Sequence, residues 1–319
     1  ERRRVLSALP QDYMTDLCTD TAAAFLSPDS PSLAKRLFTE LCTDPEIINY
    51  RLDVLEDVLK NCRPTHIAVA FDPVGPTFRH ELYKPYKAQR QSTPEDIKVS
   101  VPIIKDIIKA YEIPILEVTG YEADDVIGTV SHLAEKQGFT IFMLTPDKDY
   151  AQLVTDNIFM YRPSFKGYET LGREDVYKKW SVSSCSQIID LLGLMGDTSD
   201  NIPGCPGVGE KTASKLLDEY GSIEQILENT GKLKGALKTK IEDNIENIKL
   251  SKFLATIRLD VPIAFNEDDF VLQSPNLENL LSIFKSLEFK SFIKRYEENL
   301  NSKYYNIDAV VFSMVKMVL

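Results

Sequence analysis

The chain has 319 residues and a formal net charge of −11, with 43% hydrophobic and 27% charged residues. This composition is that of a folded globular protein, and no apolar run reaches the roughly 18 residues that a membrane-spanning helix needs. The acidic balance excludes nucleic-acid binding through overall charge, so such binding needs local basic patches. Five scattered cysteines without a CxxC pair indicate reduced thiols rather than a disulfide framework, and hence a cytoplasmic location.

Residues 1–60 read as helices joined by loops, because they contain no strand-like apolar run. From about residue 65 the pattern changes, and apolar runs indicate buried strands at 65–72, 113–118, 140–147 and 158–163. A helix is expected at 122–138, where apolar residues recur at helical spacing before a glycine. Strands that alternate with helices predict an α/β fold with a parallel sheet, here over residues 61–172.

Residues 173–300 have a mainly helical texture. Helices are expected at 186–196 and 210–221, on either side of a loop rich in Gly, Pro and Asp. This region reads as a helical module appended to the sheet. The tail at 301–319 stays unassigned, although its apolar end indicates a docked strand or helix.

Acidic residues gather at strand ends, helix starts and tight loops: Asp72, Glu122, Asp124, Asp125, Asp147, Asp149, Asp197 and Asp200. Each group alone is explained by helix capping or turn formation. Together they point to one site, because ligands bind at the carboxyl ends of parallel strands. Converging carboxylates repel unless they are protonated or hold cations, and Mg²⁺ prefers oxygen ligands. The sequence therefore predicts a metal-dependent phosphate enzyme, since a two-metal site can hydrolyse a phosphodiester.

Two further stretches suit nucleic acid. In 78–91, basic residues are interleaved with aromatic ones, a combination that binds a phosphate backbone and stacked single-stranded bases. The alternative is a solvated helix face. The loop 204–213 is not a Walker A loop, because Glu210 stands where the lysine should follow. It fits a hairpin that grips a nucleic-acid backbone without reading bases, and the alternative is a plain Gly/Pro turn.

The stretches "THIAVAFDPVGPTFRHELYKPYKAQR", "GYEADDVIGT", "TPDKDYAQLV" and "LLGLMGDTSDNIPGCPGVGEKTASKLL" occur in this order. From about residue 60 to about 296, the chain resembles the 5′-nuclease domain of bacterial DNA polymerase I, within the flap endonuclease family. The resemblance implies a PIN-like α/β core with a helical arch at 78–100 and a helix-hairpin-helix DNA-binding module. It also implies hydrolysis of a phosphodiester bond near a 5′ end, nick or flap, with an RNA primer on DNA as a further substrate and no membrane partner.

The resemblance assigns roles to individual residues. Two Mg²⁺ or Mn²⁺ ions would be held by Asp72, Glu122, Asp124, Asp125, Asp147, Asp149, Asp197 and Asp200. Lys87 and Arg90 would act on the scissile phosphate as catalytic residues. DNA would contact Arg79, Lys84, Lys87, Arg90, Gly204, Gly207, Gly209, Lys211 and Thr212. A K⁺ ion often accompanies the hairpin loop in this family.

The chain departs from the family pattern at both ends. The family opens with an apolar strand that supplies a further Asp ligand, and residues 1–60 show no such strand. They resemble instead the start of the core of MutS-type mismatch-repair ATPases, without a nucleotide-binding motif. No polymerase module follows residue 300. The sequence thus leaves three readings: a 5′ nuclease weakened by the missing Asp, an inactive DNA-binding module, or a truncated chimera with exposed sheet edges.

Overall fold

The computed structural model describes residue 59 and residues 64–90, 95–164, 167–299 and 311–317. The chain divides into two compact units. Unit 1 combines Glu1–Asp72, Ser92–Glu117 and Phe265–Leu319, and unit 2 combines Pro73–Gln91 and Val118–Ala264. The helices expected before residue 60 lie outside the described residues. The expected boundaries at 61–172 and 173–300 remain a prediction.

Unit 1 is built on the strand β1 (His66–Phe71), all six residues of which are buried. This burial explains the continuous apolar run in the sequence. Strand β2 (Ile115–Leu116) pairs with β1 in parallel and is much shorter than the run expected at 113–118. The helices that the structure describes in this unit are α6 (Glu95–Ala110), the 3₁₀ helix η5 (Glu267–Phe270), α14 (Leu277–Ser286) and α15 (Lys290–Asn299).

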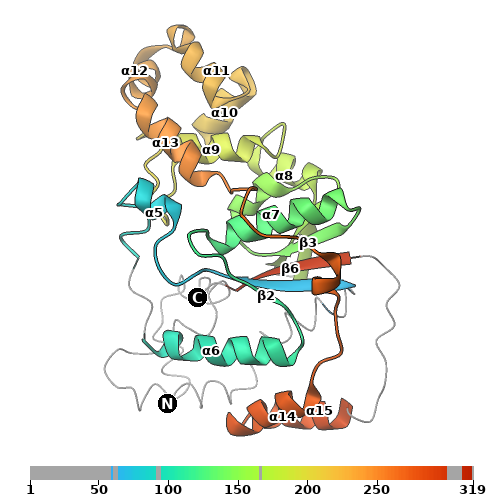
Figure 1. Cartoon of the computed structure of the whole chain (residues 1–319). Helices are drawn as coiled ribbons and strands as arrows, with labels where there is room; N and C mark the ends of the chain where they lie inside the picture. The colour runs from blue at the N-terminus through green and yellow to red at the C-terminus, as the bar shows by residue number, and fades with distance from the viewer. Residues whose placement is uncertain (1–58, 60–63, 91–94, 165–166, 300–310, 318–319) are drawn as a thin grey trace. The chain divides into compact units, whose positions relative to one another are not determined.

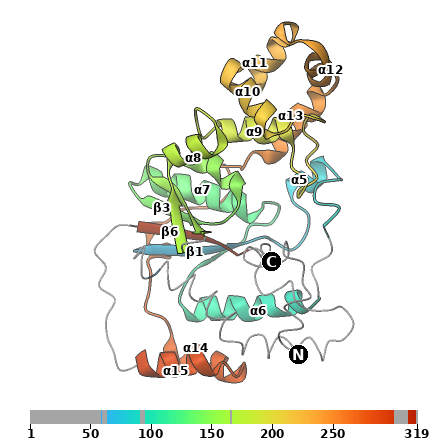
Figure 2. The same cartoon turned by 180° about the vertical axis from the view of Figure 1, so that it is seen from behind.

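The tail of the chain supplies the second neighbour of β1. Strand β6 (Val311–Met317) runs parallel to β1, with His66 opposite Phe312 and Phe71 opposite Met317. Figure 2 shows β6 in red beside β1 in blue. The expectation of a docked strand or helix at the end of the chain is thus confirmed as a strand. Because β1 is paired on both edges, the exposed edge that the chimera reading requires is absent at this strand.

Unit 2 contains three of the six strands of the sheet, together with helix α7 (Ala123–Lys136), which packs against them. Strand β3 (Thr140–Leu144) pairs in parallel with β4 (Ile158–Ser164), and β5 (Gly167–Leu171), which the sequence analysis did not predict, pairs antiparallel to β4. Helix α7 buries one face through Val126, Ile127, Val130 and Ala134. The predicted strands at 140–147 and 158–163 and the helix at 122–138 are therefore confirmed.

Helices make up the other end of unit 2, drawn in yellow and orange in Figure 1. Helix α9 packs against both α10 and α13. The Lys252 ammonium of α13 lies 2.6 Å from Asp190 of α9 and 2.8 Å from Glu224 of α11, which ties three helices together. The short elements of this unit are α5 (Phe78–Leu82), η3 (Lys148–Leu153), α8 (Arg173–Trp180), α11 (Ile223–Glu228) and η4 (Thr230–Lys232). The longer helices here are α9 (Gln187–Met195), α10 (Glu210–Tyr220), α12 (Gly235–Asp243) and α13 (Ile245–Ala255). None of the helices that the structure describes is long and apolar enough to cross a membrane.

The pairing of β6 with β1 makes a prediction about stability. Proline at Val315, which lies opposite Val69, would remove a backbone donor from the middle of the strand. We expect Val315→Pro to lower the free energy of unfolding in urea by about 2 to 3 kcal/mol. Val315→Thr keeps the donor and the β-branched shape, so it should change stability far less. Equal stability of the proline variant and the parent chain would show that β6 is not held in the sheet.

Candidate functional site

The three acids at the start of α7 point in different directions. Glu122 stands at the N-cap, and its backbone N–H donates to the Asp125 carboxylate at 3.0 Å. Asp125 is fully buried and accepts two hydrogen bonds from the Arg79 guanidinium, at 2.7 and 2.8 Å. The backbone N–H of Arg258 donates to the same carboxylate at 2.8 Å. Each Asp125 oxygen thus accepts two hydrogen bonds from the protein itself.

This arrangement bears on two predictions, the metal-binding role of Asp125 and the DNA contact of Arg79. The Asp125 oxygens are taken up by fixed donors in a buried position, which favours a structural role. Arg79 is 2% exposed, and it also donates to the carbonyl oxygens of Leu254 and Thr256 at 2.8 Å each. The Arg79 guanidinium is thus turned to the interior of the unit, and its contact with DNA stays a prediction. The pair instead links α5 and α7 to the end of α13.

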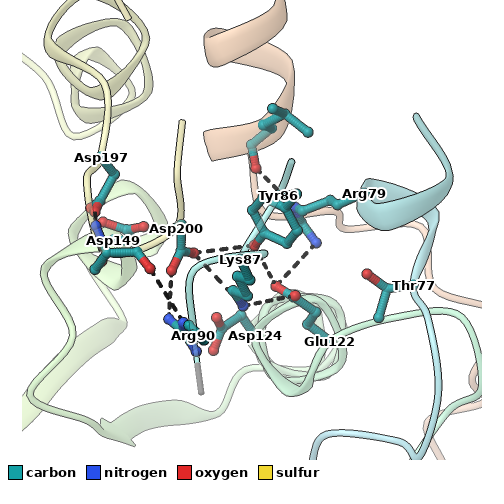
Figure 3. Close-up of polar contacts among 12 residues, drawn as sticks. Thr77, Arg79, Tyr86, Lys87, Arg90, Glu122, Asp124, Asp149, Asp197 and Asp200 are labelled. Atoms are coloured by element: carbon teal, nitrogen blue, oxygen red, sulfur yellow. Dashed lines mark hydrogen bonds and ion pairs between the residues drawn. The ribbon is translucent and has the colours of Figure 1, made fainter. Parts of the chain in front are cut away.

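Glu122 faces a cluster of donors. Its carboxylate lies 2.8 Å from the Lys87 ammonium and 3.6 Å from the Arg79 guanidinium, and it accepts a hydrogen bond from the Tyr86 hydroxyl at 3.0 Å. Figure 3 shows these side chains converging. Burial opposes ionisation of Glu122, but the positive charges of Lys87 and Arg79 outweigh it and hold the pKa of Glu122 below its ordinary value. Glu122 is therefore a buried anion at neutral pH.

The first part of the predicted arch is fastened to the loop that follows α9. The backbone N–H of Lys87, a residue with a φ of +53°, donates to the Asp200 carbonyl at 3.0 Å. The Asn201 side chain donates to the Pro85 carbonyl at 2.7 Å. Arg90 donates to the Asp200 carboxylate at 2.5 Å, and the Lys87 ammonium lies 3.7 Å from the same carboxylate. Lys87 and Arg90, predicted as catalytic residues, thus both face acids, whereas Lys84 is exposed.

A second acidic group follows β3. The Asp147 carboxylate accepts the Asp149 backbone N–H at 3.0 Å, and the Lys148 ammonium lies 2.8 Å from Asp197. Asp149 Oδ1 is buried without a hydrogen-bond partner among the described residues. Burial and then the charge of Asp147 raise the pKa of Asp149 well above its ordinary value. Burial opposes ionisation of Asp197 too, but hydrogen bonds from Lys148 and Ser199 lower the pKa of Asp197.

These acids have the chemistry that a divalent cation requires. Glu122, Asp147, Asp149, Asp197 and Asp200 all belong to unit 2, as does Asp124, which accepts the Tyr150 hydroxyl at 2.5 Å. The buried Asp149 oxygen is an oxygen donor that a cation could satisfy. Within the described ranges, however, no three acidic, His or Cys side chains are gathered closely enough to hold an ion. Instead, Lys87, Arg90 and Lys148 pair with Glu122, Asp200 and Asp197. Asp72 follows β1 and belongs to unit 1.

Two residues of the site were missed in the sequence analysis. Tyr86 bridges two acids, since its hydroxyl also donates to Asp200 at 3.2 Å. Lys148 neutralises Asp197 from a different loop. Their positions in the sequence could have indicated both residues. Tyr86 directly precedes Lys87, and Lys148 stands between Asp147 and Asp149.

The predicted hairpin forms a tight loop before α10. Gly204 and Gly207 have φ values of +59° and +79°, which favour glycine. A Cβ atom on Gly204 would lie 2.3 Å from the Gly196 nitrogen, so no other residue fits. Gly209 caps α10, and Lys211 is exposed on its first turn. The contact of this loop with DNA, including that of Thr212, remains a prediction.

Residues 29–181 match the family described as the 5′-3′ exonuclease N-terminal resolvase-like domain, and residues 183–278 match the 5′-3′ exonuclease C-terminal SAM fold. The 5′-3′ exonuclease of Aquifex aeolicus is 38% identical over 247 residues, which are 77% of this chain and 83% of that protein. The chain belongs to the 5′-3′ exonuclease family. DNA polymerase I of Bacillus subtilis is 42% identical over 249 residues, 77% of this chain and 28% of the polymerase. The chain thus spans less than a third of the length of the DNA polymerases that it matches in Bacillus caldotenax and Bacillus subtilis.

The matched range also bears on the segment before residue 60. It begins at residue 29, inside the segment 1–60 for which we expected no likeness to the nuclease family. Nothing supports the resemblance of that segment to MutS-type ATPases.

Solved structures agree with the fold. T5 5′-exonuclease with bound zinc ions has a TM-score of 0.56 at 20% identity, over 83% of this chain and 95% of that chain. The catalytic core of Rad2 in complex with a DNA substrate also has a TM-score of 0.56, at 16% identity, over 82% of this chain and 87% of that chain. The predicted fold class, an α/β nuclease core with an appended helical module, is confirmed.

The different surroundings of Asp125 and Asp149 predict opposite mutational effects. Asp125→Asn would leave the Arg79 guanidinium buried without its counter-charge, so we expect a loss of about 3 kcal/mol or more in unfolding free energy. Asp149→Asn removes a buried charge from beside Asp147, so it should keep or raise stability in EDTA. Thermal melting measures both effects. A stable Asp125→Asn variant would contradict the structural role of the buried pair.

Proposed function

We propose that this chain is a metal-dependent 5′ nuclease that hydrolyses DNA phosphodiester bonds near a 5′ end or a 5′ flap. The observation that carries the proposal is the buried Asp149 oxygen, which lacks a hydrogen-bond partner among the described residues while Asp147, Asp197 and Asp200 add negative charge around it. Such a carboxylate is costly unless it shares a proton or a cation. A divalent cation resolves that cost and suits the family's reaction.

Mg²⁺ or Mn²⁺ would be held by the acids of unit 2, namely Glu122, Asp124, Asp147, Asp149, Asp197 and Asp200. The role of Asp72, which belongs to unit 1, stays an expectation from the resemblance. When bound, such ions lower the pKa of water and stabilise the attacking and leaving oxygens of a phosphodiester. T5 5′-exonuclease binds zinc ions in its solved structure, which supports this assignment.

Lys87 and Arg90 would position the scissile phosphate. In the structure their positive groups lie against Glu122 and Asp200. A phosphate at this place would receive the same donors, because ammonium and guanidinium groups pair with phosphate oxygens as they do with carboxylates. Neutralising the charge of the phosphate would also favour attack of water on its phosphorus atom. Lys87 and Arg90 would therefore contribute to catalysis.

The helical module would bind the duplex part of the DNA, at a distance from the phosphate that reacts. The backbone of the loop 204–209 and the exposed Lys211 suit contacts with phosphates of a duplex. The solved T5 flap endonuclease complex contains DNA and metal ions, which supports flap DNA as a substrate. Nicked DNA and RNA primers on DNA extend the proposal by resemblance alone. A K⁺ ion bound at this loop likewise extends the proposal by resemblance alone. At this loop the Gly207 carbonyl lies 3.5 Å from the Lys240 ammonium.

The free thiols of Cys185 and Cys205 fit a cytoplasmic location.

Cleavage is expected to be slow. The resemblance implies a further Asp on an apolar strand of the core, yet neither strand paired with β1 contains an acid, since β2 reads IL and β6 reads VFSMVKM. Glu117, just after β2, is paired with Lys105. The same observation favours a second candidate function, a DNA-binding module without catalysis, whose sign would be metal-independent flap binding that weakens steeply with salt.

The test is cleavage of a labelled 5′-flap DNA by the purified chain with Mg²⁺ or Mn²⁺. We expect slow cleavage that EDTA stops and that Asp147→Asn abolishes. Lys87→Ala should reduce the rate about 100-fold, as loss of a charge-stabilising donor does. Lys136→Ala is the matched control, because this exposed lysine lies at the other end of α7, about 20 Å along the helix.

Three outcomes separate the alternatives. Cleavage that persists in Asp147→Asn comes from a contaminant. Flap binding without cleavage by any variant or metal supports the binding module. An equal effect of the Lys87 and Lys136 substitutions would contradict the proposed role of Lys87.

A further inference from the structure

Three aromatic side chains from distant parts of the sequence meet on unit 2. Phe78 of α5 lies 5.9 Å from Tyr121 and 6.2 Å from Phe253 of α13, measured between ring centroids, with the second pair edge to face. We call Phe78, Tyr121 and Phe253 the aromatic platform. Phe253 is 42% exposed, and among the described residues it is the one aromatic side chain of the four large apolar ones that are exposed.

The platform rests on a rigid base. The Arg79 guanidinium lies 4.5 Å from the centre of the Phe78 ring, and Arg79 is fixed by Asp125 and by the Leu254 carbonyl. The backbone N–H of Phe78 donates to the Gly120 carbonyl at 3.0 Å, next to Tyr121. The rings are therefore held in place before any ligand binds, which lowers the entropy cost of binding.

The platform is continuous with the candidate nuclease site. Tyr121 directly precedes Glu122, and the Arg79 beneath Phe78 approaches the Glu122 carboxylate at 3.6 Å. Glu122 in turn binds Lys87, the residue proposed to hold the phosphate. An exposed, rigid aromatic surface beside a phosphate site suits a nucleobase, because every base has a flat face that can stack on an aromatic ring. Such stacking does not depend on the nucleotide sequence.

We propose that the aromatic platform stacks an unpaired base of the DNA strand whose phosphate enters the site at Lys87 and Arg90. This inference rests on the proposed function and adds to it a base contact through Phe253. Stacking of an unpaired base would favour frayed or flapped ends over a fully paired duplex, because pairing keeps the base within its own stack. The contact would confer preference for structure rather than for sequence.

The test compares binding of 5′-flap DNA by fluorescence anisotropy in Ca²⁺, for the parent chain and for Phe253→Ala, Phe253→Tyr and Leu259→Ala. We expect Phe253→Ala to raise Kd about fivefold to tenfold. Phe253→Tyr should restore binding, and Leu259→Ala, which removes another exposed apolar side chain (46% exposed), should leave it unchanged. Equal melting temperatures would show that every variant is folded.

Abasic sites, moved one nucleotide at a time through the flap junction, identify the stacked base. At one position the abasic DNA should bind the parent chain as weakly as intact DNA binds Phe253→Ala, and the two changes together should cost no more than either alone. Additive losses at all positions would overturn the proposal. So would unchanged DNA affinity of Phe253→Ala, including the case where sedimentation shows that this variant loses self-association. If the parent chain binds no flap DNA, both the proposed function and the stacking proposal are contradicted. If Phe253→Ala binds flap DNA as tightly as the parent chain, only the stacking proposal is contradicted.

Discussion

Repulsion among buried carboxylates is the constraint on which the site in unit 2 depends. Asp149 raises this problem most directly, because burial and the charge of Asp147 disfavour its ionised form. The protein offsets the remaining negative charge with its own cations, since Lys148 pairs with Asp197, and Lys87 and Arg90 pair with Glu122 and Asp200. These contacts also hold the first part of the predicted arch against the loop after α9. The same ion pairs therefore neutralise the acids and fix the local structure of this region.

The buried pair of Arg79 and Asp125 keeps that site in shape. It joins α5, the start of α7 and the carbonyls at the end of α13, elements that are far apart in the sequence. Because these partners are buried, breaking the pair would leave an uncompensated charge rather than a solvated one. The pair fixes Glu122 at the helix start on one side and carries Phe78 on the other. One ion pair thus supports both the acidic site and the aromatic platform.

The sequence predicted the elements with strong local patterns, such as β1, β3, α7 and α9, because burial of one face or of both leaves a periodic trace. It could not separate Asp125 from Glu122 and Asp124, since the difference arises from Arg79, 46 residues away in the chain. The place of β6 beside β1 was likewise beyond reach, because strand pairing across more than 200 residues leaves no local signal. The basic stretch around Arg79 predicts a surface residue, and only the fold buries its side chain.

The central claim is that Lys87, Arg90 and Lys148 neutralise acids that would also hold the metal ions. The most direct measurement is the affinity for Mn²⁺, from isothermal titration with electron paramagnetic resonance of the free ion, for the parent chain and for Lys148→Gln. If Lys148 competes with the ion for Asp197, the variant should bind Mn²⁺ more tightly than the parent chain while melting at a lower temperature in EDTA. Weaker or unchanged Mn²⁺ binding by the variant would contradict the account.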